Sequence, residues 1–193
     1  MSLLFSPYTF QAPSGPLTLP NRIVIAPMCQ YSSVEGEAND WHLAHWTQML
    51  NSGAGMLTLE ATAVSRDSRI THGCLGLWDE RTAAALQDHL QRARRLAPPM
   101  PVCIQLGHAG RKASSEVPWR GGQLIPIDQG GWQPSGPSAL PHLPQEAAPR
   151  PMSLADIAQV RADFVAAARR SAEIGIEAIE LHAAHGYLLH QFL

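Results

Sequence analysis

Short apolar runs alternate along this chain with segments of helical periodicity. The runs cover residues 23–28, 56–64, 102–106 and 176–181, and a helical pattern lies in each gap between them. Strands and helices that alternate in this way predict parallel strands joined by right-handed crossovers. The fold is therefore expected to be α/β, as either a doubly wound sheet or a (β/α)8 barrel.

Three helices are expected, each with one apolar face. Their apolar positions are Leu43, Trp46 and Leu50; Leu86, Leu90, Ala93 and Leu96; and Ile157, Val160, Phe164 and Ala168. Ser153 and Asp156 form a pattern similar to a capping box, in which a hydroxyl and an acid satisfy N–H groups of the first turn. We expect the third helix to begin there and to end near Gly175, because glycine favours the conformation that terminates helices.

Two segments lack this periodicity. Residues 1–22 combine four prolines with short apolar pieces, which predicts a small hairpin or an extended cover before the first strand. Residues 112–152 carry two Gly-Gly pairs and eight prolines. A stretch of that length inside a compact domain is usually a lid, a binding loop or disordered. We interpret it as an excursion over the site of a single domain that covers residues 1–193.

The turn after the first strand distinguishes a doubly wound sheet from a (β/α)8 barrel. A dinucleotide-binding sheet carries Gly-x-Gly-x-x-Gly at this point, whereas this chain has Ala26-Pro27-Met28-Cys29. The barrel is therefore favoured. A complete (β/α)8 TIM barrel takes about 250 residues, so four strands in 193 residues correspond to about its first four βα units.

Composition narrows the classes of function. Fourteen basic residues balance 16 acidic ones, without a long basic run, which favours neither nucleic acid nor an anionic membrane as a partner. The start lacks the pattern of a signal peptide, and no apolar run approaches the roughly 20 residues of a membrane span. Three widely spaced cysteines indicate free thiols. We expect a cytoplasmic protein that acts on a small molecule.

Chemically capable residues follow the strands. Parallel strands place all their carboxyl ends at one rim, where ligands bind. The residues expected to meet there are Cys29, Tyr31, Ala61, Gln105, His182, His185 and Tyr187. Each of them has a purely structural interpretation as well, but two imidazoles and a phenol within six residues favour a functional site.

Two other chemistries are conceivable at this rim. A metal-dependent hydrolase would use His182 and His185 as ligands, but the spacing lacks the Glu of His-Glu-x-x-His, and no third ligand is evident. No metal site is therefore predicted. A nucleophilic Cys29 would need a neighbour that lowers its pKa, and the sequence identifies none.

Four segments carry a family resemblance. Residues 21–32, 60–64, 105–112 and 182–188 resemble, in order, the signatures of the old yellow enzyme family, and especially of its bacterial xenobiotic-reductase branch with a cysteine at the flavin. The resemblance runs through nearly the whole chain. It implies a TIM barrel that holds FMN, takes hydride from NADPH or NADH, and reduces activated C=C bonds of α,β-unsaturated carbonyl or nitro compounds.

The resemblance also implies roles for particular residues. The segment expected to line the flavin is Ala26, Pro27, Met28 and Cys29, together with a backbone group of Ala61 and the amide of Gln105. Cys29 would also tune the flavin potential. The pair His182 and His185 would hold the substrate oxygen, Tyr31 would contact the substrate, and Tyr187 would donate the proton.

The chain departs from the family pattern after Leu193, where the second half of the barrel would follow. In such barrels the phosphate site is built after strands seven and eight. The resemblance therefore implies an N-terminal half, and a homo-oligomer for the full-length form. The alternative is a truncated, non-catalytic half-barrel that needs a partner or the missing half, because four strands leave two open edges.

Overall fold

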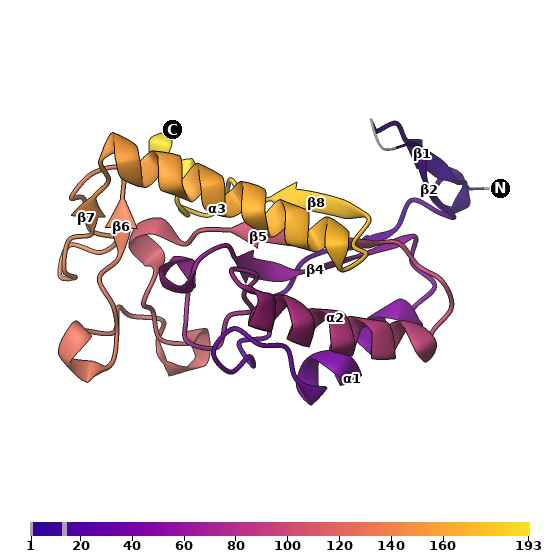
Figure 1. The fold of residues 1–193 in the computed structure, drawn as a ribbon, viewed down its shortest axis with the longest axis horizontal. Coiled ribbons are helices and arrows are strands. Elements are labelled where there is room, and N and C mark those ends of the chain that lie inside the picture. The colour runs from indigo at the N-terminus through magenta and orange to yellow at the C-terminus, as the bar shows by residue number, and fades with distance from the viewer. Residues whose placement is uncertain (1, 13–14) are drawn as a thin grey trace.

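A parallel four-stranded sheet organises the molecule. In the computed structural model, which describes residues 2–12 and 15–193, its order is β3 (Val24–Ile25), β4 (Met56–Ala63), β5 (Val102–Gly107) and β8 (Ala178–Leu181). All pairings are parallel, so the carboxyl ends of the strands lie at one end of the sheet (Figure 1). The predicted parallel α/β fold is confirmed.

Three helices supply the main hydrophobic core. They are α1 (Asp40–Leu50), α2 (Glu80–Arg95) and α3 (Leu154–Glu173). The core is formed by Trp46 and Leu50 of α1, Leu86, Leu90 and Ala93 of α2, Ala167 of α3, and Leu57, Leu59, Val102, Ile104 and Leu106 of the strands. Side chains alternate along a strand, so Cys103 and Gln105 face away from this core. That second face would be the interior of a barrel.

A hairpin covers the amino-terminal end of the sheet. Strands β1 (Tyr8–Phe10) and β2 (Leu17–Leu19) pair antiparallel, and Leu19 packs against Met56 and Cys103. In Figure 1 this hairpin lies at the end of the sheet opposite the strand carboxyl ends. The predicted hairpin cover is confirmed, and the candidate site lies at the other end.

The excursion after β5 lies beyond the carboxyl ends of the strands (Figure 1). It contains two short parallel strands, β6 (Ser135–Gly136) and β7 (Arg150–Pro151). The 3-10 turns of the described chain are η1 (Leu3–Phe5), η2 (Arg66–Ser68), η3 (Gly110–Lys112), η4 (Pro118–Arg120), η5 (Ile127–Gln129) and η6 (His190–Phe192). Backbone and indole N–H groups attach the excursion to the loop after β4, from Ser115 to Ile70 O and from Trp132 to Asp67 O.

Side-chain caps fix the helix starts. Ser153 and Asp156 form the predicted capping box of α3, and Asn39 with His42 forms the equivalent box of α1. Helix α2 begins at Glu80, ahead of its first apolar marker Leu86, because Asp79 accepts the N–H of Thr82. The prediction that Leu96 belongs to its buried face was wrong, because Leu96 is the residue that caps the end of the helix and is 64% exposed. Within the described ranges, no helix is both long and apolar enough to cross a bilayer.

Two strand predictions were wrong in extent. The first strand is limited to Val24–Ile25, and Val24 is 44% exposed rather than buried on both faces. It pairs only with β4 and ends before Pro27, which has no N–H to donate to a ladder. The last strand begins at Ala178 and stops at Leu181, one residue before His182.

The predicted buried face of α3 was also only partly correct. Ile157 is 37% exposed, and Phe164 is half-buried at the edge of the main core. These side chains line an open apolar groove of about 250 Å³ with Leu181, Leu188 and Phe192. The described chain contributes no further layer over this groove, so the amphipathic pattern is not fully satisfied within these residues.

Candidate functional site

Three aromatic rings converge where the chain leaves β8. The ring centroids of His182 and Tyr187 are 4.7 Å apart, those of His182 and His185 are 5.1 Å apart, and those of His185 and Tyr187 are 6.5 Å apart. The backbone N–H of His182 donates to Leu106 O at 2.9 Å, which continues the β5 ladder past the end of β8. The rings are therefore placed by the central sheet rather than by a free loop.

The tautomer of His182 follows from one hydrogen bond. The Ala184 N–H donates to His182 Nδ1 at 3.3 Å, so the proton of a neutral imidazole lies on Nε2. Burial, followed by the neighbouring His185, lowers the pKa of His182. Near neutral pH this side chain is an uncharged donor that can bind an oxygen atom through Nε2–H.

The turn that follows β8 is tightly held. His185 adopts a left-handed backbone conformation with φ of 58°, and its carbonyl accepts from Lys112 Nζ at 2.9 Å. The same ammonium lies 4.9 Å from the centre of the Tyr187 ring, a cation–π contact. His185 is exposed at the rim, whereas His182 is buried beneath it. The two imidazoles therefore approach a ligand from different depths.

Both tyrosines of the site retain their protons. Burial, with Cys29 and Cys74 as further causes, raises the pKa of Tyr187 well above its usual value. Tyr31 is raised in the same direction, mainly by burial. Its backbone is left-handed, with φ of 49°, and its ring meets Trp119 of the excursion edge-on at 5.8 Å. Two neutral phenols thus flank the histidines as potential proton donors.

Cys29 is also a neutral group. Burial, and then Cys74 and Glu60, raise the pKa of its thiol to about 12. A catalytic thiolate requires a lowered pKa, so this environment does not favour a cysteine nucleophile. Of the three residues before Cys29, Ala26 and Met28 are exposed and Pro27 is half-buried, so this segment lies at the surface where the chain leaves β3.

Ala61 and Gln105 occupy neighbouring positions in the sheet. Ala61 pairs in register with Gln105, which pairs in turn with Glu180. The Gln105 amide donates from Nε2 to Glu180 Oε1 at 2.5 Å. This bond fixes the orientation of the amide. Glu180, for which the sequence suggested no partner, therefore acquires one.

A small cavity connects the strand ends with the rings. Its lining is Ala61, Thr62, Ala63, Ser68, Ile70, Cys74, Gly107, His108, Ala109, His182 and Tyr187. Ala61, His182 and Tyr187 are thus brought together as predicted, whereas Gln105 is engaged with Glu180 and His185 stays at the rim. The cavity also includes His108, which the sequence argument did not assign to the site. Its Nδ1 accepts from Gly110 N at 3.0 Å, and burial lowers its pKa to about 4.

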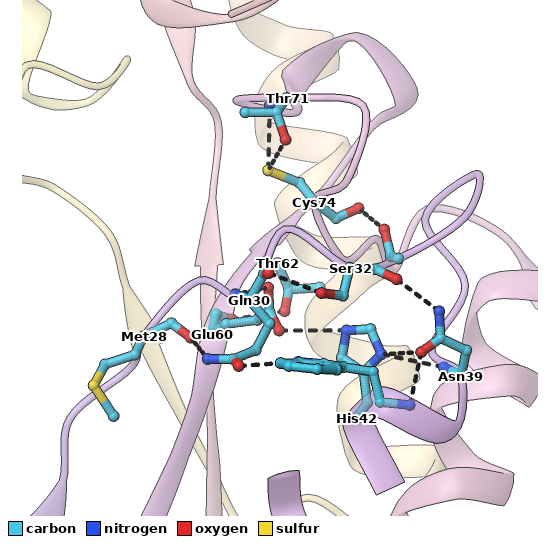
Figure 2. Close-up of polar contacts among 11 residues, drawn as sticks. Met28, Gln30, Ser32, Asn39, His42, Glu60, Thr62, Thr71 and Cys74 are labelled. Atoms are coloured by element: carbon cyan, nitrogen blue, oxygen red, sulfur yellow. Dashed lines mark hydrogen bonds and ion pairs between the residues drawn. The ribbon is translucent and has the colours of Figure 1, made fainter. Parts of the chain in front are cut away.

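Sequence reasoning also missed a buried acid–imidazole pair. Glu60 of β4 and His42 of α1 lie 3.4 Å apart and are almost completely buried (Figure 2). The available signal was a charged residue inside an otherwise apolar strand, which requires a partner when buried. The sequence did not reveal that the partner would come from α1.

No cluster of three metal-ligating side chains occurs in residues 2–12 and 15–193. The pair formed by His182 and His185 lacks a third histidine, cysteine or carboxylate ligand. The donor set therefore gives no support to a metal-dependent hydrolase.

Comparison with known proteins identifies the family. A model described as the NADH:flavin oxidoreductase / NADH oxidase family matches residues 3–193. The chain belongs to this family. An NADH:flavin oxidoreductase of Gibberella zeae is 41% identical over 197 residues, covering 98% of this chain and 46% of the relative. An NADPH dehydrogenase of Listeria monocytogenes is 40% identical over 200 residues, covering 100% of this chain and 52% of the relative.

Solved structures support the fold of this family. Morphinone reductase matches with a TM-score of 0.79 at 25% identity, covering 98% of this chain and 50% of that one. An Old Yellow Enzyme from Pichia sp. AKU4542 matches with a TM-score of 0.81 at 24% identity, covering 98% and 48%. The resemblance to old yellow enzymes and the partial barrel are thereby confirmed. The chain spans about half the length of the curated relatives it matches.

Proposed function

We propose that the full protein is an FMN-dependent ene-reductase that uses NADPH or NADH to reduce activated C=C bonds of α,β-unsaturated carbonyl or nitro compounds. The observation that carries this proposal is the group of three rings at the carboxyl end of the parallel sheet, 4.7 to 6.5 Å apart. Membership of a flavin oxidoreductase family supports it.

The residues at this end fit a flavin ring by their chemistry. The Gln105 amide offers a donor and an acceptor, as the edge of a flavin pyrimidine requires, and Glu180 fixes its orientation. Ala26 and Ala61 have small side chains that allow a planar ring to approach the backbone. The backbone of Pro27, Met28 and Cys29 would continue the same wall. Bound FMN would supply hydride transfer between the nicotinamide and the substrate carbon.

The side chains above this wall account for substrate activation. His182 holds an Nε2–H donor and His185 a second imidazole, which together would bind the carbonyl or nitro oxygen. Donors aimed at this oxygen stabilise negative charge that develops there during the reaction. Tyr187 keeps its proton and would deliver it to carbon, and Tyr31 would contact the substrate from the excursion side.

The test uses the protein expressed at full length. It should bind FMN, lose flavin absorbance with NADPH in the absence of oxygen, and regain it with 2-cyclohexenone. His182→Ala removes one oxygen donor and should slow the second step by about a hundredfold. His89→Ala on α2, away from the rings, is the matched control and should leave that rate unchanged. A protein that binds no FMN, or reoxidation that is equally fast in His182→Ala, would contradict the proposal.

Two broader assignments are proposed with it. The full-length protein is a homo-oligomer, which exposed apolar side chains of α3 such as Leu154 and Val165 support. Light scattering of the full-length protein tests this assignment. The protein is cytoplasmic, which the free thiols of Cys29, Cys74 and Cys103 support, because such thiols persist in reducing compartments. Cell fractionation tests the location.

A further inference from the structure

Glu60 interrupts the regular pairing of the central sheet. Leu59 pairs with Ile104 and Ala61 pairs with Gln105, so Glu60 is the extra residue of a β-bulge between β4 and β5. A bulge bends the strand and re-aims a side chain, and such bulges are frequent beside active sites. Here the re-aimed side chain is a carboxylate that is almost completely buried.

The carboxylate of Glu60 has two specific neighbours. Oε2 accepts the backbone N–H of Gln30 at 3.1 Å, and Oε1 lies 3.4 Å from His42 Nε2. Neither Oε1 nor His42 Nε2 makes another hydrogen bond within the described parts of the chain, and both are sealed from solvent. A buried charge with so few partners is costly to maintain. Neither the backbone hydrogen bonds of the sheet nor those of α1 require a carboxylate at this position.

The capping box of α1 determines how His42 faces Glu60. The Asn39 N–H lies 3.2 Å from His42 Nδ1 and Asn39 Oδ1 lies 3.1 Å from the same nitrogen, so Asn39 holds this edge of the ring and leaves Nε2 toward the carboxylate. The imidazole of His42 therefore faces Glu60 Oε1 with its Nε2 edge, while its other edge is held by Asn39. Three further titratable groups lie near this carboxylate: His45, one turn further along α1, and the thiols of Cys29 and Cys74.

The same contacts hold the segment that carries Cys29, which we call the thiol loop (residues 28–33). Figure 2 shows Gln30 beside Glu60. The indole N–H of Trp41 in α1 donates to Gln30 Oε1 at 3.1 Å. Gln30 Nε2 donates to Met28 O at 2.8 Å, on the other side of Cys29. Further along the loop, Asn39 Nδ2 donates to Ser32 O at 2.6 Å. Cys29 thus lies between two residues whose positions depend on α1 and Glu60.

We propose that Glu60 is a positioning residue, which together with His42 fixes the thiol loop and holds a carboxylate at the backbone N–H of Gln30, next to Cys29. A carboxylate at this place disfavours a second negative charge on the neighbouring thiol, so that Cys29 faces its ligand as an uncharged group. The titratable neighbours of Cys29 are Cys74, Glu60, Tyr31 and Tyr187, and the first two raise its pKa further after burial has done so. The inference rests on the proposed function only where it identifies that ligand as the flavin.

The test is the alkylation rate of Cys29 at pH 9, followed by mass spectrometry of its peptide. Iodoacetamide reacts with the thiolate, so the rate reports the fraction of thiol that has lost its proton. Glu60→Gln keeps the size and an acceptor for Gln30 N but removes the charge. In this variant Cys29 should be alkylated several-fold faster than in the unmodified protein. Glu60→Asp keeps the charge and should stay close to the unmodified protein, and Glu37→Gln, which removes a carboxylate elsewhere, should change nothing.

The buried thiols of Cys74 and Cys103 show whether faster alkylation of Cys29 comes from loss of the Glu60 charge or from loss of structure. They should stay unreactive in every folded variant. Equal rates for Glu60→Gln and the unmodified protein would overturn the proposal, and so would equal acceleration in Glu60→Gln and Glu60→Asp. If Glu60→Gln does not fold, Glu60→Ala decides, because it also removes the charge and must make Cys29 react faster than it does in Glu60→Asp. The assay uses neither flavin nor substrate, so its result can be interpreted even if the proposed function is wrong.

Discussion

His182 combines burial with a fixed tautomer, and both properties depend on its immediate neighbours. Its Nδ1 is occupied by Ala184 N–H, so any ligand encounters the Nε2 side. A neutral imidazole donates without introducing a charge that would have to be desolvated. This arrangement suits a donor that binds a polarised oxygen, and it requires that the ring remain unprotonated across the working pH range.

The pKa of His182 can be tested directly. Burial is the main cause of its lowering, and His185 is the second, so an NMR titration should place its midpoint below the usual value of about 6.5. His185→Ala removes the second cause and should move the midpoint upward, although not past that value. A midpoint above 6.5 in the unmodified protein would show that the ring is neither desolvated nor influenced by its neighbour.

His108 should make stability depend on pH. Burial lowers its pKa to about 4, whereas the unfolded chain binds this proton below about 6.5. The unfolded state therefore gains protons first, and the folded state loses stability as pH falls from about 6.5 to about 4. Between pH 7 and pH 5 this loss is about 2 kcal/mol. His108→Asn, which can still accept from Gly110, should lack this loss, as urea unfolding at the two pH values would show.

At the level of elements, helix α3 depends on its amino-terminal cap. Ser153 Oγ accepts from Asp156 N at 3.2 Å, and Asp156 Oδ2 accepts from Ser153 N at 2.8 Å. Ser153→Ala should lower the free energy of unfolding by about 1 kcal/mol, because one N–H of the first turn loses its acceptor. Ser153→Thr keeps the hydroxyl and serves as control in denaturant titrations. Equal stabilities of Ser153→Ala and Ser153→Thr would exclude the cap as a source of stability.

Trp132 is one of the side chains that attach the excursion to the loop after β4. Trp132 donates from its indole to Asp67 O at 2.8 Å, and the Arg69 guanidinium lies 5.0 Å from its ring centre. Trp132→Ala should release the segment and increase cleavage within residues 112–152 during limited proteolysis. Trp119→Ala is the control, since Trp119 is 68% exposed and anchors less. If both variants are cut at the rate of the unmodified protein, the excursion has other anchors.

At the level of the whole molecule, the described sheet has two open edges. Strands β3 and β8 each pair on one side only, and Leu181 of β8 is 58% exposed beside the apolar groove of α3. An unpaired edge with an apolar flank favours association. We expect the 193-residue chain, produced alone, to pair with a second copy. Light scattering after size exclusion should give a mass above that of the monomer.

Leu181→Lys is the matched variant for this association, because lysine on an edge opposes pairing and leaves the main core untouched. It should shift the equilibrium toward monomer. A monodisperse monomer of the unmodified chain with well-dispersed NMR signals would contradict the expectation. It would also argue against the alternative that these residues survive only by pairing.

Local patterns determined much of the architecture. The alternation of strand and helix signals required parallel strands, and their carboxyl ends had to meet at one rim, so the positions of Cys29, Gln105 and His182 could be inferred. The cap of α3 was readable because Ser153 and Asp156 are three residues apart. These inferences succeed because they depend on periodicity and on short-range hydrogen bonds, which the order of residues specifies directly.

Tertiary structure alone decided how charge is arranged at that rim. The Glu60 carboxylate meets His42 from another element, and a bulge turns it beneath the thiol loop. Glu180 orients Gln105 across two strands, 75 residues apart in sequence. Such pairings depend on strand register and helix docking, which are set by packing of the whole core. Sequence order could place these residues near the site, but only packing could determine which of them would touch.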